Sequence, residues 1–325
     1  MKAIALLALV AAGCSAQESM LLVLEKGGSA LAFCSPAGEC PAVAPVGEHP
    51  HEIVLSPDGR FAYVSDNGTM RIEQAGSGGN TVSIVDLAAR RKVGEISLGR
   101  FRRPHGLALD AKSGLLAVTT ELPDQLVLVD VAARRVVRTV DTQGKTSHMV
   151  ALGRDGRFAY VSNSGSASVS VVDLRSGAVK VLATGARPEG SMTSRDGRRV
   201  YVCNREAAAI TIIDTATNEV AGTIATGKGP VRIAETPDGK LVYAAMHDRR
   251  VELADPETRK VLRVSAKLEG DPVSLHLSAD GKLAFASAEE MDLVYRLSVP
   301  DLKIVGSFRM PKGSAPDPVL EKPGR

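Results

Sequence analysis

The chain has 325 residues and a mass of 34.1 kDa, and 44% of its residues are hydrophobic, which suffices for a large core and excludes disorder over most of its length. The 40 Lys and Arg residues nearly balance the 37 Asp and Glu residues, so the net charge of +3 provides no strong field for nucleic acid or anionic lipid. Trp is absent, and with 5 Tyr and 6 Phe the chain has few aromatic faces for stacking bases, so we expect no nucleic-acid partner.

Residues 1–16 have the features of a secretory signal peptide. Lys2 precedes an apolar run from Ala3 to Ala12, which has the length of a signal-peptide core and is too short to span a bilayer. The next residues end in Gly-Cys and resemble a lipobox, in which Cys14 would carry a lipid anchor; cleavage after Ala16 is the alternative. Either interpretation predicts an exported protein, periplasmic or anchored to a membrane as a lipoprotein, in a compartment where disulfides persist.

The rest of the chain repeats a turn of the Asp-Gly type at a nearly constant spacing. The marker glycines are Gly59, Gly114, Gly156, Gly197, Gly239 and Gly281, so the steps between them are 55, 42, 41, 42 and 42 residues. Each unit contains four short apolar stretches, which are HEIVLS, RFAYVS, TVSIVDL and KVGEISL in the first complete copy. Four strands in about 42 residues are typical of a propeller blade, and strands that are apolar on both sides are expected where both faces are buried.

Seven such blades are predicted. Six complete units begin at His51, His105, His148, Glu189, Val231 and Val273, and three strands within LLVLEKGG, SALAFCS and AVAPVG precede them. Near the C-terminus, Asp317-Pro318-Val319 repeats the opening Asp271-Pro272-Val273 of the preceding unit. We therefore expect an all-β, seven-bladed propeller of four-stranded antiparallel blades over residues 19–320. Pairing of its N- and C-terminal strands closes the ring, a short tail follows at 321–325, and the protein is a monomer.

The second strand of several units carries a recurring motif. YVSD at residues 63–66, YVSN at 160–163 and YVCN at 201–204 each follow the turn and precede a strand of the VxVVD type. Over residues 20–320 this pattern resembles the YVTN-repeat β-propeller family. Similar repeats occur in seven-bladed lactonase-like proteins, in periplasmic propellers and in propeller domains related to the haem d1 and amine dehydrogenase types. The resemblance implies the fold and does not select among these functions, because one fold hosts many chemistries.

The first blade departs from the others at the end of its third strand. Five units end that strand with an aspartate that can accept hydrogen bonds from the following turn; these are Asp86, Asp130, Asp173, Asp214 and Asp255. Cys34 occupies this position in the first blade, and Cys40 lies where its fourth strand begins. We predict a Cys34–Cys40 disulfide, with two unpaired thiols as the alternative, and a buried structural thiol at Cys203.

One position of each blade should open the innermost strand at the mouth of the central channel. Around the ring this position is occupied by His51, His105, His148, Glu189, Val231, Val273 and Val319. The three imidazoles and the carboxylate would face a shared space, where they could hold one divalent transition-metal ion such as Zn, Mn, Fe or Cu. The alternative is that they only hydrate the channel rim. His49 and His247 either complete such a site or are surface imidazoles.

The ends of the second strands return to the same mouth and add candidate ligand-binding residues. These are Asp66, Glu121, Asn163, Asn204, Arg205 and His247. Arg187 and Arg232, with other basic residues near the strand openings, make the mouth locally basic, which favours a small anionic ligand; a solvated rim is the alternative. The long Gly-rich loop from Asp66 to Asn80 should hang over this mouth as a lid or as a surface loop.

Three functions are consistent with these features. The first is an exported propeller that binds a small anionic ligand or an envelope protein without chemistry. The second is a lactonase-like hydrolase or isomerase, with or without a metal ion, in which His105 or His148 acts as the general base. In that enzyme Glu189 would orient the base or bind the metal, and Arg187 or Arg232 would stabilise an oxyanion. The third is an envelope scaffold protein.

Overall fold

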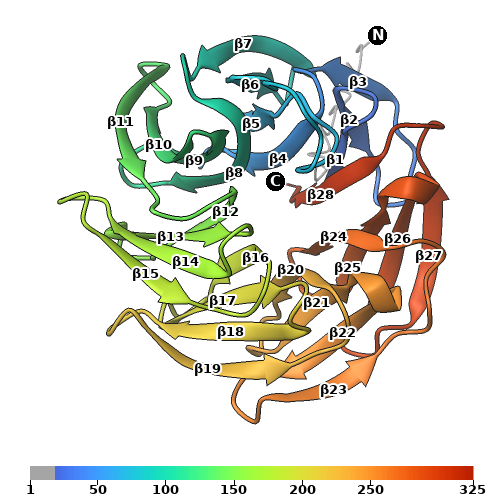
Figure 1. Cartoon of the computed structure of the whole chain (residues 1–325). Helices are drawn as coiled ribbons and strands as arrows, with labels where there is room; N and C mark the ends of the chain where they lie inside the picture. The colour runs from blue at the N-terminus through green and yellow to red at the C-terminus, as the bar shows by residue number, and fades with distance from the viewer. Residues whose placement is uncertain (1–18, 325) are drawn as a thin grey trace, which may run out of the picture.

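The computed structural model describes residues 19–324, which form seven four-stranded antiparallel sheets in a ring (Figure 1). The predicted all-β, seven-bladed propeller is confirmed. The helical elements of these residues are two single 3₁₀ turns, η1 (Met246–Asp248) and η2 (Glu289–Met291). Over the same range there is no apolar helix of the length that a membrane crossing needs. The segment predicted as a signal peptide and the predicted lipidation site at Cys14 lie outside the described residues.

Each blade has its strands in chain order from the channel outward, except that the C-terminal strand is the innermost strand of the first blade. Blade 1 consists of β28 (Pro316–Lys322), β1 (Met20–Glu25), β2 (Ala30–Cys34) and β3 (Ala42–Pro45). Blade 2 consists of β4 (Pro50–Leu55), β5 (Phe61–Asp66), β6 (Thr81–Asp86) and β7 (Arg91–Ser97). Blade 3 consists of β8 (Arg102–Asp110), β9 (Leu115–Leu122), β10 (Asp124–Asp130) and β11 (Arg135–Asp141). Blade 4 consists of β12 (Ser147–Leu152), β13 (Phe158–Asn163), β14 (Ser168–Asp173) and β15 (Val179–Ala183).

The remaining three blades follow the same plan. Blade 5 consists of β16 (Pro188–Thr193), β17 (Arg199–Asn204), β18 (Ala209–Asp214) and β19 (Glu219–Ala225). Blade 6 consists of β20 (Pro230–Glu235), β21 (Leu241–Ala245), β22 (Arg250–Asp255) and β23 (Lys260–Val264). Blade 7 consists of β24 (Pro272–Leu277), β25 (Leu283–Ala288), β26 (Leu293–Ser298) and β27 (Ile304–Arg309).

The two ends of the propeller close the ring. β28 pairs antiparallel with β1, with Val319 opposite Val23 and Leu320 opposite Leu22, as predicted from the repeat. The strand continues through Lys322 and so includes the first two residues of the segment expected as a tail. Because β28 pairs with the inner edge of β1, the first blade has four strands like the other six, and the ring is closed.

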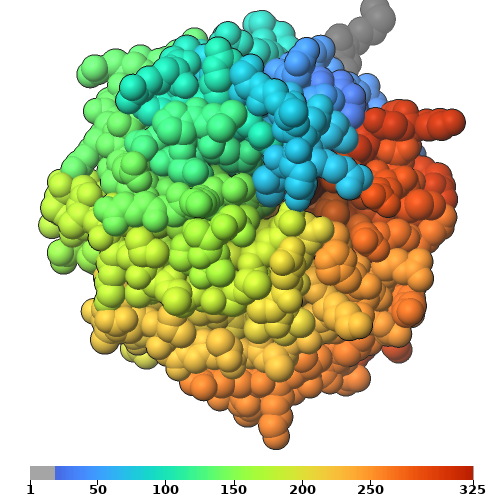
Figure 2. All heavy atoms as spheres, viewed as in Figure 1, coloured from blue at the N-terminus to red at the C-terminus, as the bar shows by residue number. Residues whose placement is uncertain are grey.

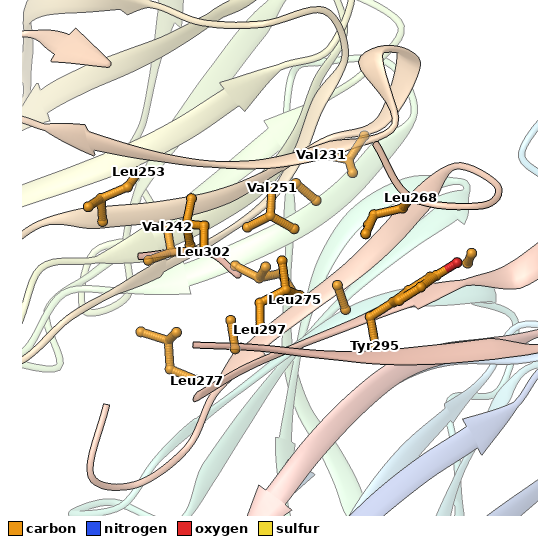
Figure 3. Packing of buried hydrophobic residues seen from close by; sticks show 14 of the residues in the cluster. Val231, Val242, Val251, Leu253, Leu268, Leu275, Leu277, Tyr295, Leu297 and Leu302 are labelled. Atoms are coloured by element: carbon orange, nitrogen blue, oxygen red, sulfur yellow. The ribbon is translucent and has the colours of Figure 1, made fainter. Parts of the chain in front are cut away.

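The motif YVCN explains how one strand serves two cores. Along β17, Val200 and Val202 pack with Tyr160 of blade 4, whereas Tyr201 and Cys203 pack on the other face with β21 of blade 6. Side chains of a strand alternate between its faces, so both faces of this strand are buried. Figure 3 shows the same kind of contact between blades 6 and 7, where Val242 and Val251 pack against Leu275 and Leu297.

The turn residues act as their chemistry predicts. Gly59 ends the Ser-Pro-Asp-Gly turn with a φ of 65°, a conformation that glycine adopts without steric cost. Asp86 accepts hydrogen bonds from the amides of Ala88 and Ala89 at 3.0 and 2.9 Å. Cys34 and Cys40 form the predicted disulfide, and Cys203 is buried and unpaired. A structural disulfide favours an oxidising compartment, which is consistent with export.

Candidate functional site

A cavity of about 310 Å³ lies at the mouth of the channel. One residue from the start of each innermost strand lines it; these are His51, His105, His148, Glu189, Val231, Val273 and Asp317. The three histidines and Glu189 are therefore brought to one space, as the repeat predicted. Arg187, Arg205 and Arg232 line the same cavity.

The seventh member of this ring is Asp317, and the prediction of Val319 was wrong. Five of the innermost strands begin with a proline, and the residue after each of them lines the cavity. In β28 that proline is Pro316. The comparison of repeats matched Pro318 to Pro272 instead, which placed Val319 in the ring. Val319 instead lines a smaller chamber of about 160 Å³ deeper in the channel. The ring therefore has two carboxylates, at Glu189 and Asp317.

The ends of the second strands contribute a second ring of residues around the mouth. Most of the residues that sequence analysis assigned to this ring lie one position too early in the chain. The residues opposite the strand-opening prolines include Asp66 and Asn204, and Asn163 lies opposite Ser147 at the same position. The residues that follow this position around the ring are Lys26, Asn67, Glu121, Ser164, Arg205, Met246 and Glu289. Lys26, Arg205, Met246 and Glu289 line the cavity. The repeat could have identified Lys26 and Glu289, since they occupy the same place as Arg205.

Asp66, Asn163 and Asn204 do not reach the cavity. Their buried side chains are hydrogen bonded to hydroxyl groups of the third strand in their own blade, with Thr81 donating to Asp66 at 2.7 Å. Asn163 donates to Ser170 at 2.8 Å, and Asn204 donates to Thr211 at 2.8 Å. These side chains join the strands of the blades. His247 is exposed on η1, where its Nε2 lies 3.4 Å from Nε of Arg205.

The predicted basic character of the mouth is offset by carboxylates. The lining contains the cations Lys26, Arg71, Arg187, Arg205 and Arg232 together with Glu73, Glu189, Asp271, Glu289, Glu290 and Asp317. Each cation is paired: Lys26 lies 3.3 Å from Glu289, and Arg205 lies 3.0 Å from Glu189. Arg232, whose side chain is 14% exposed, lies between Glu52 and Asp317 and lines both chambers. The cavity is therefore not a simple anion trap.

The histidines form a connected group with Glu121. His51 Nδ1 lies 3.3 Å from His105 Nε2, and His105 Nδ1 lies 3.2 Å from Oε1 of Glu121. The ring of His148 lies against that of His105, with centroids 3.7 Å apart. All four side chains are buried. Glu121 Oε2 lies 2.9 Å from Nε of Arg103, which holds the carboxylate from its far side.

The hydrogen bonds determine which nitrogen of His105 carries a proton. The carbonyl oxygen of Thr69 lies 2.7 Å from His51 Nε2 and can only accept, so this nitrogen donates. In a neutral ring, His51 Nδ1 then accepts a hydrogen bond from the N–H at His105 Nε2, and the other nitrogen of His105, Nδ1, carries a lone pair. That lone pair faces the carboxyl group of Glu121, so a proton or another cation is required between two acceptors.

Burial sets the protonation of this group. It lowers the pKa of His51 and His105 well below the ordinary value and lowers that of His148 to about 4, so the rings are neutral near pH 7. Burial also raises the pKa of Glu121 to about 7, against the opposing charge of Arg103. Burial acts to raise the pKa of Glu189 too, but charge interactions with His148 and Arg205 and hydrogen bonds from Arg187 and Arg205 hold it below its ordinary value.

Among residues 19–324, the side chains that could together hold a metal ion are His105, Glu121 and His148, whose ligand atoms lie within 4.8 Å of one another. Two of the four predicted ligands, His105 and His148, belong to this group. His51 lies outside it because both of its ring nitrogens are engaged, and Glu189 lies outside it because Arg187 and Arg205 hold its carboxylate. Nδ1 of His148 is buried without a hydrogen-bond partner among residues 19–324.

The long loop after β5 closes over this cavity; we define the lid as residues 67–80. Its base is fixed by Asn67 and Thr69, which are buried and hydrogen bonded to each other. Its tip, Met70–Glu73, lines the cavity. In Figure 2 the sky-blue segment that contains the lid reaches over the middle of this face. The predicted position of the loop over the mouth is therefore confirmed.

Comparisons with known proteins agree with this architecture. Residues 140–230 match the family model of the YNCE-like β-propellers. The seven-bladed β-propeller protein Rv1057 of Mycobacterium tuberculosis is 30% identical over 234 residues, which cover 62% of this chain and 59% of the relative. Both matches agree with the seven-bladed β-propeller fold of this chain. This propeller thus spans less than two thirds of the curated relative that it matches.

Solved structures resemble the propeller in fold at low sequence identity. A chain of Kuenenia stuttgartiensis hydrazine synthase has a TM-score of 0.72 and 20% identity, over 86% of this propeller and 92% of that chain. The dihydro-heme d1 dehydrogenase NirN has a TM-score of 0.66 and 20% identity, over 90% of this propeller and 64% of that chain. A functionally unknown protein from Desulfotomaculum acetoxidans has a TM-score of 0.78 and 15% identity, over 94% of this propeller and 99% of that chain. At these identities the likeness concerns the fold alone.

Proposed function

We propose that this propeller binds a divalent transition-metal ion in its channel mouth through His105, Glu121 and His148. The observation that carries the proposal is the 3.2 Å approach of His105 Nδ1 to Oε1 of Glu121. The hydrogen bonds of His51 leave both atoms as acceptors, so a proton or a metal ion belongs between them, and we propose that a metal ion displaces the proton. Nδ1 of His148, the third side chain of the group, has no hydrogen-bond partner among the described residues and is therefore available as a ligand.

The donor set fits such an ion. Neutral imidazole and carboxylate groups are the ligands of Zn²⁺ and of Fe²⁺ in sites with two histidines and one carboxylate. Two ligands about 2.1 Å from a tetrahedral ion lie roughly 3.4 Å apart, which is close to the spacing of His105 and Glu121. Arg103 and His51 would hold the two ligands in place from behind, as outer hydrogen-bond partners commonly do at metal sites.

The cavity in front of these ligands supports the binding of a small molecule. A three-ligand ion has open coordination positions, and when bound it can polarise a carbonyl group or activate a water molecule. The volume of about 310 Å³ is at the lower end of the range for small-ligand pockets. We propose that a small anionic ligand enters here and that the protein acts in an exported, oxidising compartment, in agreement with the Cys34–Cys40 disulfide.

Titration calorimetry with Zn²⁺ and with Fe²⁺ on chelator-treated protein tests the proposal. We expect one ion per chain, with affinity reduced by more than about 100-fold in His105→Ala and in Glu121→Gln. His247→Ala is the matched control, because it removes an exposed imidazole from the same face. Equal affinity in the wild type and both ligand variants would contradict the proposal. Lactone hydrolysis, isomerisation, binding of an envelope protein and scaffolding stay predictions of the sequence analysis.

A further inference from the structure

The lid places a carboxylate on an arginine of the cavity. Oε1 of Glu73 lies 2.6 Å from Nη2 of Arg187, although 114 residues separate them in the chain. Arg187 also pairs with Glu189 at 2.9 Å and, more distantly, with Glu206 at 3.5 Å. Glu189 lies two residues after Arg187, at the start of β16, and Glu206 lies in the turn after β17. Of these three carboxylates, Glu73 alone comes from the lid.

The tip of the lid is held from inside the fold by Arg103 and on its outer side by two ion pairs. Arg103 is buried and donates to the carbonyl groups of Arg71, Ile72 and Gln74 from inside the fold. Outside the fold the tip is held by Glu73 on Arg187 and by Arg71 on Glu290, at 2.6 and 3.1 Å. Glu73, Arg71 and Glu290 are each 63–68% exposed, and exposed ion pairs stabilise a structure only weakly.

Entry of a ligand and release of Arg187 are coupled by this arrangement. The tip both covers the cavity and carries Glu73, so a movement that uncovers the cavity also removes one carboxylate from Arg187. The freed Nη2 then faces the space that the tip has left. A guanidinium group binds a carboxylate through parallel hydrogen bonds. The carboxylate of a ligand would therefore make the same type of hydrogen bond to Arg187 as Glu73 does.

We propose that Arg187 is the binding subsite for a small carboxylate ligand and that Glu73 occupies this subsite in the closed protein. The proposal deepens the proposed function by naming the class of ligand. The subsite itself consists of side chains of this chain and does not require the metal ion. A small carboxylate therefore competes with the lid, and the lid tip acts as a built-in weak inhibitor of binding.

Calorimetric titration of chelator-treated, metal-free protein with succinate tests the proposal separately from metal binding. Glu73→Gln should tighten succinate binding by about three- to fivefold, because a weak exposed competitor is removed. Arg187→Gln should abolish binding, alone and combined with Glu73→Gln. Glu290→Gln is the control, since it releases the other ion pair of the tip without exposing Arg187, and it should change the affinity less than Glu73→Gln.

Three results would overturn the proposal. They are equal tightening in Glu290→Gln and Glu73→Gln, retained binding in Arg187→Gln, and no binding of succinate to Glu73→Gln. Thermal unfolding of each variant confirms that it is folded. A failure here with intact Zn²⁺ binding rejects the carboxylate subsite alone, whereas loss of Zn²⁺ binding concerns only His105, Glu121 and His148.

Discussion

His51 Nδ1 lies 3.3 Å from His105 Nε2, although the two histidines are 54 residues apart and belong to neighbouring blades. The carbonyl of Thr69 in the lid base holds the other nitrogen of His51. The tautomer of His105 is thus determined by His51, which lies outside the candidate metal group of His105, Glu121 and His148. His51 is a positioning residue, because its hydrogen bond directs the lone pair of His105 toward Glu121.

Replacing His51 should disturb His105 before it disturbs the fold. In His51→Ala we expect Zn²⁺ affinity to fall by about 10- to 100-fold, as is typical when an outer partner of a ligand is removed. The ¹⁵N chemical shifts of His105 in metal-free protein should change from a single tautomer to a mixture, which a purely structural role would not produce. Unchanged shifts together with wild-type affinity would show that His51 does not position His105.

The lid should depend on Arg103 for its closed conformation. Arg103→Ala removes the donors to three lid carbonyl groups, so we expect trypsin to cleave after Arg71 several-fold faster than in the wild type. Arg102→Ala is the matched control, because the side chain of Arg102 is exposed and donates to the carbonyl group of Gly78 at the far end of the lid. Cleavage rates that rise equally in both variants would contradict an anchoring role specific to Arg103.

The disulfide should stabilise the first blade to a modest extent. The bond closes a short loop, since its cysteines are 6 residues apart, and loop-closure entropy assigns such a loop about 2 kcal/mol. We expect the double variant Cys34→Ala/Cys40→Ala to lose this amount in urea unfolding and to become insensitive to reductant. The buried Cys203 remains in both proteins. A variant as stable as the oxidised wild type would refute this contribution.

His276 should make the folded protein less stable in acid. It lines the deeper chamber with Glu52 and Arg232, and burial lowers its pKa to about 4. An unfolded histidine takes up its proton near pH 6.5, so the unfolded state binds more protons between pH 6.5 and 4 and stability falls as the pH decreases through that range. A difference of one pKa unit corresponds to about 1.4 kcal/mol, so His276 contributes roughly 3 kcal/mol to the loss of folding stability over this range.

The variant His276→Leu should therefore show a weaker loss of stability from pH 6.5 to pH 4 in urea unfolding experiments. His247→Gln, which removes an exposed imidazole, should keep the wild-type pH profile. Identical profiles for His276→Leu and the wild type would mean that His276 takes up its proton in the folded protein as readily as in the unfolded chain.

The repeat made most of the fold predictable. Asp-Gly turns at a constant spacing located the blades, and strands with two apolar faces required a neighbouring blade on each side. Comparison of repeats also predicted that His51, His105 and His148 share one space. The alignment failed at Asp317, where prolines on both sides of the aspartate allowed two registers and only strand pairing distinguishes them.

The candidate metal group was less accessible to sequence analysis, for a physical reason. Glu121 and Asn163 were grouped together because both end a second strand, yet one residue of register separates them, and a shift by one residue turns a side chain to the opposite face. Two of the carboxylates that neutralise the arginines are also distant from them in sequence. Glu73 belongs to the lid and Asp317 to the closing strand, so neither shares a repeat position with its partner.

A crystal of the protein soaked in Zn²⁺ and measured at the zinc absorption edge is the most direct test of the metal site. We predict one anomalous peak within bonding distance of His105 Nδ1, a carboxylate oxygen of Glu121 and a ring nitrogen of His148. A channel mouth without such a peak, or zinc bound only at exposed side chains elsewhere, would contradict the account.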